Sequence, residues 1–332
     1  MNPHTAAVAG AEFLSRAARD GRWSAFHLYP GISDEWVTGY VAATIGEAGA
    51  PGADEILATG RRGLAGRQRP DGRYGFNARA IGDADSTLWA LRVAALPAGT
   101  AGVDVAAAHA ALAEHQRPAG IATYAADEPI RTIIEAGPER AMKGWCAPHP
   151  CVTAVAAGLA TTAPDARAAL IDQQQRDGGW PAYWWTDPEY TAGHAAEALA
   201  AAGQPAASAA AGRAAAWAAS RLHVDGSVRT GRFPNGSAFA TALALRALTA
   251  GRGPANASAA ATAWLCRHLR LDGSWQPSAV LRVPDPDDPD PDASGITRWV
   301  PDGRKEGAIV LDRTGVFTTA TVVAALTRAA HR

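Results

Sequence analysis

Two aspartates separated by one residue, Asp83 and Asp85, stand at the start of an apolar run. The segment reads Gly82-Asp83-Ala84-Asp85-Ser86-Thr87-Leu88-Trp89-Ala90-Leu91. Asp83 suits a helix N-terminus, where its side chain can accept hydrogen bonds from free backbone N–H groups. A carboxyl group is disfavoured in its charged form by burial and by a neighbouring carboxylate. Asp85 held protonated in this way could donate a proton to a weak base such as an alkene or an epoxide.

The same segment belongs to an internal repeat. Six similar turns recur along the chain, and in four of them an aromatic residue follows that can pack on the preceding helix end. Glycine suits these turns because it readily adopts a positive φ. Each turn follows a rather amphipathic segment and leads to one that is apolar nearly all round, which is typical of a fully buried helix. The turns are centred on Asp20-Gly21, Asp71-Gly72, Ala119-Gly120, Asp177-Gly178, Asp225-Gly226 and Asp272-Gly273.

Six outer helices alternating with six inner helices predict an all-α fold, an (α/α)6 toroid formed by one domain over residues 1–332. Closure of the ring spares a repeat protein its exposed end repeats. Insertions at about 122–148 and 276–314 precede the third and sixth inner helices, so both lie at the same end of the barrel. Long loops at one end of a scaffold usually cover a site, and we expect both to act as lids. The Pro/Asp run at 284–292 is expected to be a disordered surface loop, too interrupted by proline to hold magnesium.

Each of the six inner segments contains a threonine near its start, and the segments can be aligned on it. Residues at equivalent positions then form columns, and each column can be assigned a role. The position four residues before the threonine mostly holds capping residues, whereas the position two residues before it mixes acids, a thiol and aromatic rings. We expect the second set to form a ring around the mouth of the central cavity, with Tyr40 and Trp89 one turn deeper. The aligned threonines are Thr38, Thr87, Thr153, Thr191, Thr241 and Thr319, and the ring consists of Trp36, Asp85, Cys151, Glu189, Phe239 and Phe317.

This ring predicts an acid in a pocket with aromatic walls. Aromatic faces can stabilise a developing carbocation, and the exclusion of water prevents its early quenching. We expect Trp145 and Trp299, from the two insertions, to contribute to the wall. In the alternative interpretation, Asp85 and Glu189 form rim salt bridges with arginines of the insertions, for which the candidates are Arg131, Arg140 and Arg313.

The turns of the Q-x-x-D-G-x-W type, together with six helix pairs, resemble the prenyltransferase/squalene-cyclase repeat superfamily. Asp83-Ala84-Asp85-Ser86 resembles the D-x-D-D motif of class II terpene cyclases such as squalene-hopene cyclase, although Ser86 replaces the last aspartate. The resemblance implies that Asp85 is the catalytic proton donor and Asp83 the first aspartate of the motif. It implies cyclisation of an isoprenoid-type substrate without a cofactor. His149, from the next repeat, could hydrogen-bond Asp85 or could simply cap its helix.

The same superfamily contains single-toroid protein prenyltransferase subunits, which hold zinc. His149, Cys151 and Glu189 (or Asp187) could form such a site, because thiolate and imidazole suit zinc. This alternative requires a partner subunit, and a homodimer is equally open. A buried cysteine that behaves as a small apolar residue is the commoner case. A third possibility is a non-catalytic toroid that binds an apolar ligand or a protein partner.

The bulk composition narrows the classes of partner. A net charge of −1 gives no electrostatic argument for binding nucleic acid. No apolar run reaches 18 residues, so we expect no membrane span, and the first 18 residues lack the layout of a signal peptide. The three cysteines, Cys146, Cys151 and Cys266, are too few and too sparse for a disulfide framework. A cytoplasmic enzyme is the resulting prediction.

Overall fold

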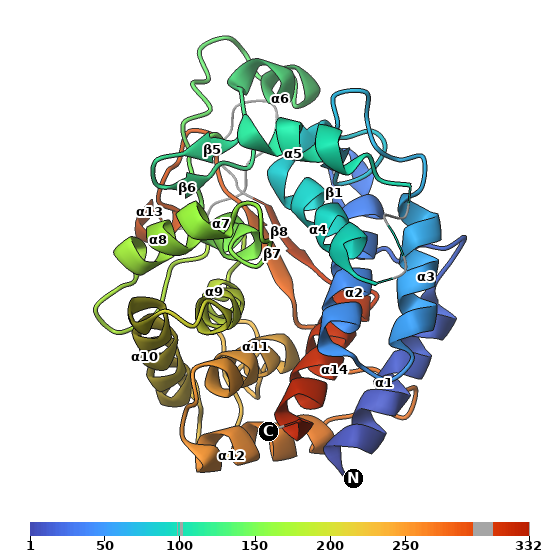
Figure 1. Cartoon of the computed structure of the whole chain (residues 1–332), viewed down its shortest axis with the longest axis vertical. Helices are drawn as coiled ribbons and strands as arrows, with labels where there is room; N and C mark the ends of the chain where they lie inside the picture. The colour runs from blue at the N-terminus through green and yellow to red at the C-terminus, as the bar shows by residue number, and fades with distance from the viewer. Residues whose placement is uncertain (98, 100–101, 295–307, 332) are drawn as a thin grey trace.

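The computed structural model describes residues 1–97, 99, 102–294 and 308–331. Its helices form two concentric layers around one axis, so the fold is all-α and toroidal, as predicted (Figure 1). The inner helices are α2 (Glu35–Ala48), α4 (Ala84–Ala95), α7 (Pro150–Ala156), α9 (Glu189–Ala201), α11 (Ala238–Ala250) and α14 (Val316–Ala330). The outer helices are α1 (Pro3–Ala17), α3 (Ala53–Leu64), α5 (Val105–Ala113), α8 (Ala163–Gln173), α10 (Pro205–Arg221) and α12 (Ala255–Arg267).

The two ends of the chain close the ring. Each inner helix packs against its neighbours in chain order, and α14 packs against α2. Each outer helix from α3 onward packs on the inner helix that precedes it, whereas α1 packs on α14. The last inner helix is therefore covered by the first outer helix, and the terminal repeats protect each other.

The threonine column explains how the turns are attached to the inner helices. Thr38, Thr87, Thr153, Thr241 and Thr319 each accept a hydrogen bond at Oγ1 from a backbone N–H just after a turn glycine. The turn tryptophans pack back on the outer helices, as the repeat predicts. The indole N–H groups of Trp23, Trp180 and Trp275 each donate to a carbonyl oxygen of the preceding outer helix at 2.8 Å.

Short antiparallel ribbons carry the connections at the end of the barrel where the inner helices begin. The longest pairs β7 with β8, with Val280 opposite Leu311. Two further helices, α6 (Asp127–Ile133) and α13 (Pro291–Ser294), lie in the connections. The strands are β1 (His27–Leu28), β2 (Gly31–Ile32), β3 (Tyr74–Gly75), β4 (Gly82–Asp83), β5 (Gln116–Arg117), β6 (Gly120–Ile121), β7 (Val280–Val283) and β8 (Ala308–Leu311).

The two insertions bind each other. Arg140 pairs with Asp285 at 2.8 Å, and Trp145 Nε1 donates to the carbonyl oxygen of Pro284 at 3.0 Å. The backbone N–H of Gly144 donates to the carbonyl of Pro286. Much of the Pro/Asp run is therefore fixed by hydrogen bonds, which corrects the expectation of a disordered loop: proline prevents regular structure but leaves carbonyl oxygens free to accept.

Candidate active site

Asp85 lies in the first turn of α4 and lines a cavity at the end of the barrel where the inner helices begin. Burial, reinforced by the charge of Asp83, raises the pKa of Asp85 to about 8. The indole N–H groups of Trp36 and Trp89 and the charge of Arg92 act in the opposite direction. Oδ1 of Asp85 has no hydrogen-bond partner within the described part of the chain. The carboxyl group is thus largely protonated at neutral pH, with one oxygen unengaged.

Asp83 is the N-cap of α4, as its residue type predicts. Its carboxylate accepts hydrogen bonds from the backbone N–H and the hydroxyl of Ser86, both at 2.8 Å. Ser86 stands where the D-x-D-D motif has its last aspartate, and it hydrogen-bonds the first aspartate of the pair, Asp83. Burial raises the pKa of Asp83 to about 6, which is lower than that of Asp85 because Ser86 stabilises the charged form.

The inward ring is formed by the second residue of each inner helix, and this corrects one position. Trp36, Asp85, Cys151, Phe239 and Phe317 each take the second place of their helices, as the threonine alignment implies. In α9 the second residue is Tyr190, which stacks on Trp185 with ring centroids 4.3 Å apart. Thr191 donates to the carbonyl of Pro181 and does not accept from a backbone N–H, since proline has none. The fourth repeat is consequently shifted by one residue.

Glu189 points out of the ring as a result of this shift. Its Oε1 accepts from Arg221 Nε of α10 at 2.7 Å, and its side chain is fully buried. Glu189 thus forms an ion pair with an outer helix instead of taking the predicted catalytic position in the ring. The alternative interpretation expected Glu189 to pair with an arginine of the insertions. Its partner, Arg221, comes from the same repeat instead.

The cavity above the ring has a volume of about 410 Å³. The ring contributes Trp36 and Asp85, the insertions contribute Tyr124 and Trp145, and strand β7 contributes Leu281. Trp299 lies outside the described residues. The remaining aromatic and aliphatic lining residues include Tyr29, Phe76, Ile81, Ile130, Ile133, Ile134, Trp184, Trp185, Val283 and Val310.

Trp185 forms the floor of this cavity and was missed from the sequence. Its ring packs against Trp36 and Phe317, with centroids 6.0 and 5.3 Å away. Phe239 and Phe317 therefore lie beneath Trp185, so they support the floor and are absent from the described lining. Tyr40 stacks under Phe317 at 3.6 Å, and Trp89 contacts Tyr40 edge-on at 4.8 Å. The aromatic run Tyr183-Trp184-Trp185, directly before an inner helix, was the available sequence signal.

His149 does not pair with Asp85. Trp184 Nε1 donates to Thr123 Oγ1 at 2.7 Å, and the Thr123 hydroxyl in turn lies 2.9 Å from His149 Nδ1. His149 Nε2 lies 2.8 Å from the carbonyl oxygen of Gly144, to which it must donate. Both ring nitrogens are therefore engaged, and burial lowers the pKa of His149 to about 3. His149 fixes the first insertion to α7, and the expected hydrogen bond to the acid is replaced by these contacts.

The alternative zinc ligands are not arranged for a metal. His149 has no free nitrogen, and Glu189 is paired with Arg221. Burial raises the pKa of the Cys151 thiol to about 11, which disfavours the thiolate that zinc requires. Across the described ranges, no group of three or more His, Cys, Asp or Glu side chains could hold a metal ion.

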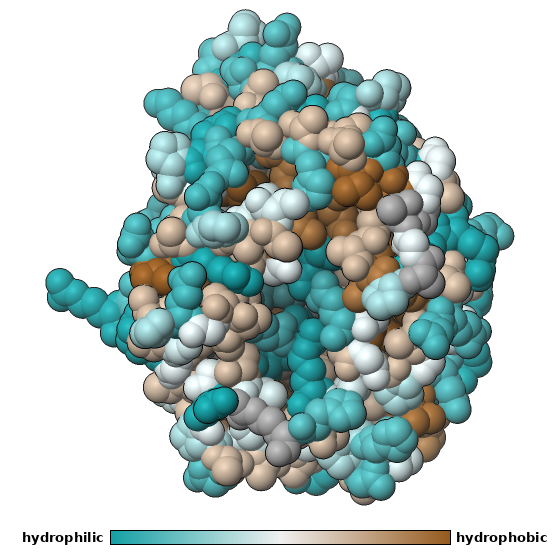
Figure 2. Space-filling view, viewed as in Figure 1, coloured by the Kyte–Doolittle hydropathy of each residue, from teal (hydrophilic) through white to brown (hydrophobic). Residues whose placement is uncertain are grey.

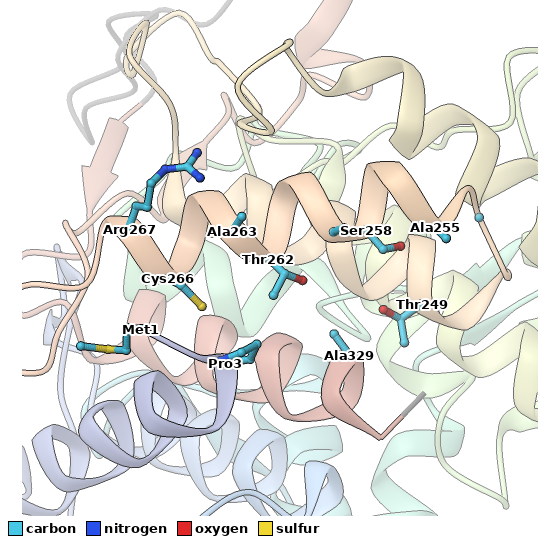
Figure 3. Close-up of a pocket in the computed structure, with 12 residues that line it drawn as sticks. Met1, Pro3, Thr249, Ala255, Ser258, Thr262, Ala263, Cys266, Arg267 and Ala329 are labelled. Atoms are coloured by element: carbon cyan, nitrogen blue, oxygen red, sulfur yellow. The ribbon is translucent and has the colours of Figure 1, made fainter.

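Two other features show that neither volume nor a raised pKa suffices to define the site. A larger hollow of about 730 Å³ lies between α12 and the ends of α1 and α14, walled mostly by small side chains such as Ala259 and Thr262 (Figure 3). Within the described lining it contains none of the predicted site residues. Burial also raises the pKa of Asp187 to about 8, but Asp187 is absent from the described lining of the cavity above the ring. Among the described residues that line this cavity, Asp83 and Asp85 are the carboxyl groups with a raised pKa, and that of Asp85 is the higher.

The fold is similar to that of solved enzymes. A structure of type II terpene cyclase MstE from Scytonema in complex with geranylgeranyl dihydroxybenzoate (substrate) is 39% identical to this chain. The match covers 99% of this chain and 97% of the MstE chain, with a TM-score of 0.88. A protein of known structure from Actinoplanes is 38% identical over 99% of this chain and 100% of its own, also with a TM-score of 0.88. The chain belongs to the type II (class II) terpene cyclases, enzymes that begin cyclisation by protonating a prenyl substrate.

More distant similarity extends to the fold alone. ent-Copalyl diphosphate synthase from Streptomyces platensis is 18% identical over 89% of this chain and 50% of its own, with a TM-score of 0.60. No protein-family model and no curated protein sequence matches the chain. In the described part of the chain, no helix is long and apolar enough to cross a membrane.

Proposed function

We propose that Asp85 is the general acid of this cyclase and that it protonates an alkene or epoxide at the end of an isoprenoid chain. The observation that carries this proposal is a carboxyl group with a raised pKa and a partnerless oxygen, at an aromatic-walled cavity. With an alkene, the proton of Asp85 forms a new C–H bond as the π bond breaks; with an epoxide, it forms an O–H bond on the ring oxygen as a C–O bond breaks. Asp85 is left as a carboxylate and the substrate as a carbocation, which the next alkene of the chain attacks to close a ring.

Asp83 assists through its charge and its position. Its carboxylate, held by Ser86, raises the pKa of Asp85 and keeps the proton on the acid until substrate arrives. Trp36 and Trp185 present aromatic rings near the acid, and their faces stabilise the cation without offering a lone pair that could capture it. Tyr124, Trp145 and Trp184 extend this wall toward the insertions.

The substrate we propose is a prenyl chain attached to a polar head group, by analogy with the geranylgeranyl dihydroxybenzoate bound by MstE. A cavity of about 410 Å³ falls in the usual range of small-molecule sites, ~300–1,000 Å³. The hydrocarbon tail would occupy the apolar walls down to Asp85, with the head group near the β1–β2 ribbon. Protonation by a carboxylic acid requires no metal or organic cofactor, so we propose that none takes part.

We further propose that the chain acts as one barrel domain with residues 122–148 and 276–314 as lids. The hydrogen bonds between Arg140 and Asp285 and between Trp145 and Pro284 support a joint role for the two insertions. The described parts of both insertions supply walls of the cavity, which supports a site built from a single chain. A cytoplasmic location and the oligomeric state stay predictions.

The decisive experiment is mass spectrometry of products from a panel of prenylated benzoates and free isoprenoids with C10 to C30 chains. Wild type should give products isomeric with the substrate, and Asp85→Asn should give none. Glu55→Gln, which removes an exposed carboxylate on α3, is the matched control and should retain activity. Equal product from wild type and Asp85→Asn would overturn the assignment of the acid.

A further inference from the structure

A layer of charged side chains crosses the barrel axis at the other ends of the inner helices. Arg92, Glu197 and Arg246 follow ring residues by two helical turns, and Glu47 and Arg328 follow them by three. We call these five residues the charged layer. The ring of inner helices in Figure 1 surrounds a hollow that Figure 2 shows to be lined by hydrophilic residues. No step of the proposed cyclisation uses this layer.

Two ion pairs in the charged layer have the same geometry. Arg92 Nε and Nη2 bind the two oxygens of Glu47 at 2.7 and 2.5 Å. Arg246 Nε and Nη2 bind those of Glu197 at 2.9 and 2.5 Å. The first pair joins α2 to α4, and the second joins α9 to α11, on the opposite side of the ring. In each pair the guanidinium fork leaves Nη1 directed away from the carboxylate.

The two remaining Nη1 groups have different surroundings. Arg92 Nη1 donates to the carbonyl oxygen of Val155 at 2.9 Å, near the end of the short helix α7. Gly158 gives it room, since a Cβ there would lie 2.6 Å from this nitrogen. The helix opposite α7 is α14, which continues to Ala330, so its carbonyls at this level belong to intrahelical hydrogen bonds.

Arg246 Nη1 accordingly finds no acceptor. Its side chain is 1% exposed, and within the described residues this nitrogen has no hydrogen-bond partner. From α14 comes Arg328, whose Nη1 is buried and equally without an acceptor in the described chain. Arg328 approaches Glu197 at 3.4 Å and Glu47 at 3.9 Å, so it shares carboxylates that already have a bidentate partner.

The layer also contains more positive than negative charge. Three guanidinium groups face two carboxylates. The neighbouring His194 adds no charge, because burial and the nearby arginines hold its pKa well below the usual value. Its Nδ1 accepts from Arg246 Nη2 at 3.3 Å. Burial and the charge of Arg246 lower the pKa of Arg328 although Glu197 opposes the change.

We propose that Arg246 and Arg328 bind a small inorganic anion, such as chloride or phosphate, which completes the charged layer. The anion supplies the acceptor that Val155 supplies to Arg92 on the opposite side of the ring. It also balances the excess positive charge and ties α11 to α14. This site lies two to three helical turns from Asp85 along the barrel, so it is distinct from the cyclisation cavity.

The test is thermal unfolding of the full chain in sodium gluconate, a salt whose bulky organic anion serves as the reference. Gluconate is replaced stepwise by chloride or by phosphate at constant ionic strength. We expect a saturable rise in Tm of about 2–4 °C at ten times the apparent Kd. Arg328→Gln should abolish this rise. Arg229→Gln, which removes an exposed arginine paired with Asp225, should leave it unchanged.

Equal rises in wild type and Arg328→Gln would reveal a general salt effect and overturn the proposal, as would a wild type without a saturable rise. If Arg328→Gln does not fold, crystals of wild type soaked in bromide give an independent result. An anomalous peak within hydrogen-bond distance of both Arg246 and Arg328 supports the site. Its absence there overturns the proposal.

Discussion

The two ends of the barrel treat carboxyl groups in opposite ways. At the cavity, Asp85 has apolar neighbours and Asp83, and its pKa rises to about 8. In the charged layer, Glu197 is comparably buried, but Arg246 and Arg328 hold its pKa at about 2. The same six helices carry both groups, two turns apart. Burial keeps a carboxyl group protonated where no cation is paired with it, whereas a paired carboxylate becomes part of the framework.

The largest effect we expect comes from removing the acid. Asp85→Asn should lower the rate of cyclisation by about 10³-fold or more, in keeping with the contribution of a general acid. Product formation measured by mass spectrometry, with circular dichroism to verify folding, provides the readout. Retention of more than a tenth of wild-type activity would show that Asp85 is not the general acid, and the proposed difference between the two ends of the barrel would be wrong.

Removal of a cation from the charged layer should damage stability. Arg246→Met leaves Glu197 buried with incomplete compensation and should lower the free energy of unfolding by about 3–5 kcal/mol. Denaturant unfolding measures this change. Arg229→Met, at an exposed ion pair, is the control and should cost less than about 1 kcal/mol. A similar loss in both variants would show that the charged layer has no special role.

The aromatic floor should affect rate more than folding. Trp185→Leu removes a ring face near Asp85 and admits water, and we expect a loss of about 10–100-fold in kcat, equivalent to ~1.4–2.8 kcal/mol. More hydrated or prematurely quenched products should accompany this loss. Trp264→Leu, at a tryptophan outside the described cavity lining, serves as the comparison. An unchanged product profile in Trp185→Leu would place the cation elsewhere.

The smallest effect concerns pH. Asp85 must be protonated to act, so activity should be full well below its pKa and should fall as the pH rises through about 8. Asp83→Asn keeps a capping residue but removes the charge that raises the pKa of Asp85, so the alkaline limb should move to lower pH. Rate profiles between about pH 5 and pH 10 compare the two proteins. A limb that stays in place, or moves upward, would contradict the assigned role of Asp83.

The repeat, and hence the ring, can be read from local sequence patterns. Six turns, six buried helices and the pair Asp83 and Asp85 can be identified from local patterns, because turns, capping and helix periodicity depend on neighbours in the chain. Trp36 and the other ring positions followed from one alignment. The same reasoning failed where one repeat departs from the others, since Thr191 resembles the aligned threonines although Tyr190 occupies the ring position.

Which polar groups acquire partners depends on how distant parts of the chain pack together. Glu189 pairs with Arg221, and His149 hydrogen-bonds Thr123 and Gly144, so neither side chain is bound to Asp85. Trp185 reaches the barrel axis from a connection whose path no local pattern specifies. The pKa of a buried carboxyl group depends on the charges within a few ångströms of it, and those charges come from distant parts of the chain. The sequence therefore identifies Asp85 as the proposed acid, whereas the packing of six helices determines whether this carboxyl group keeps its proton.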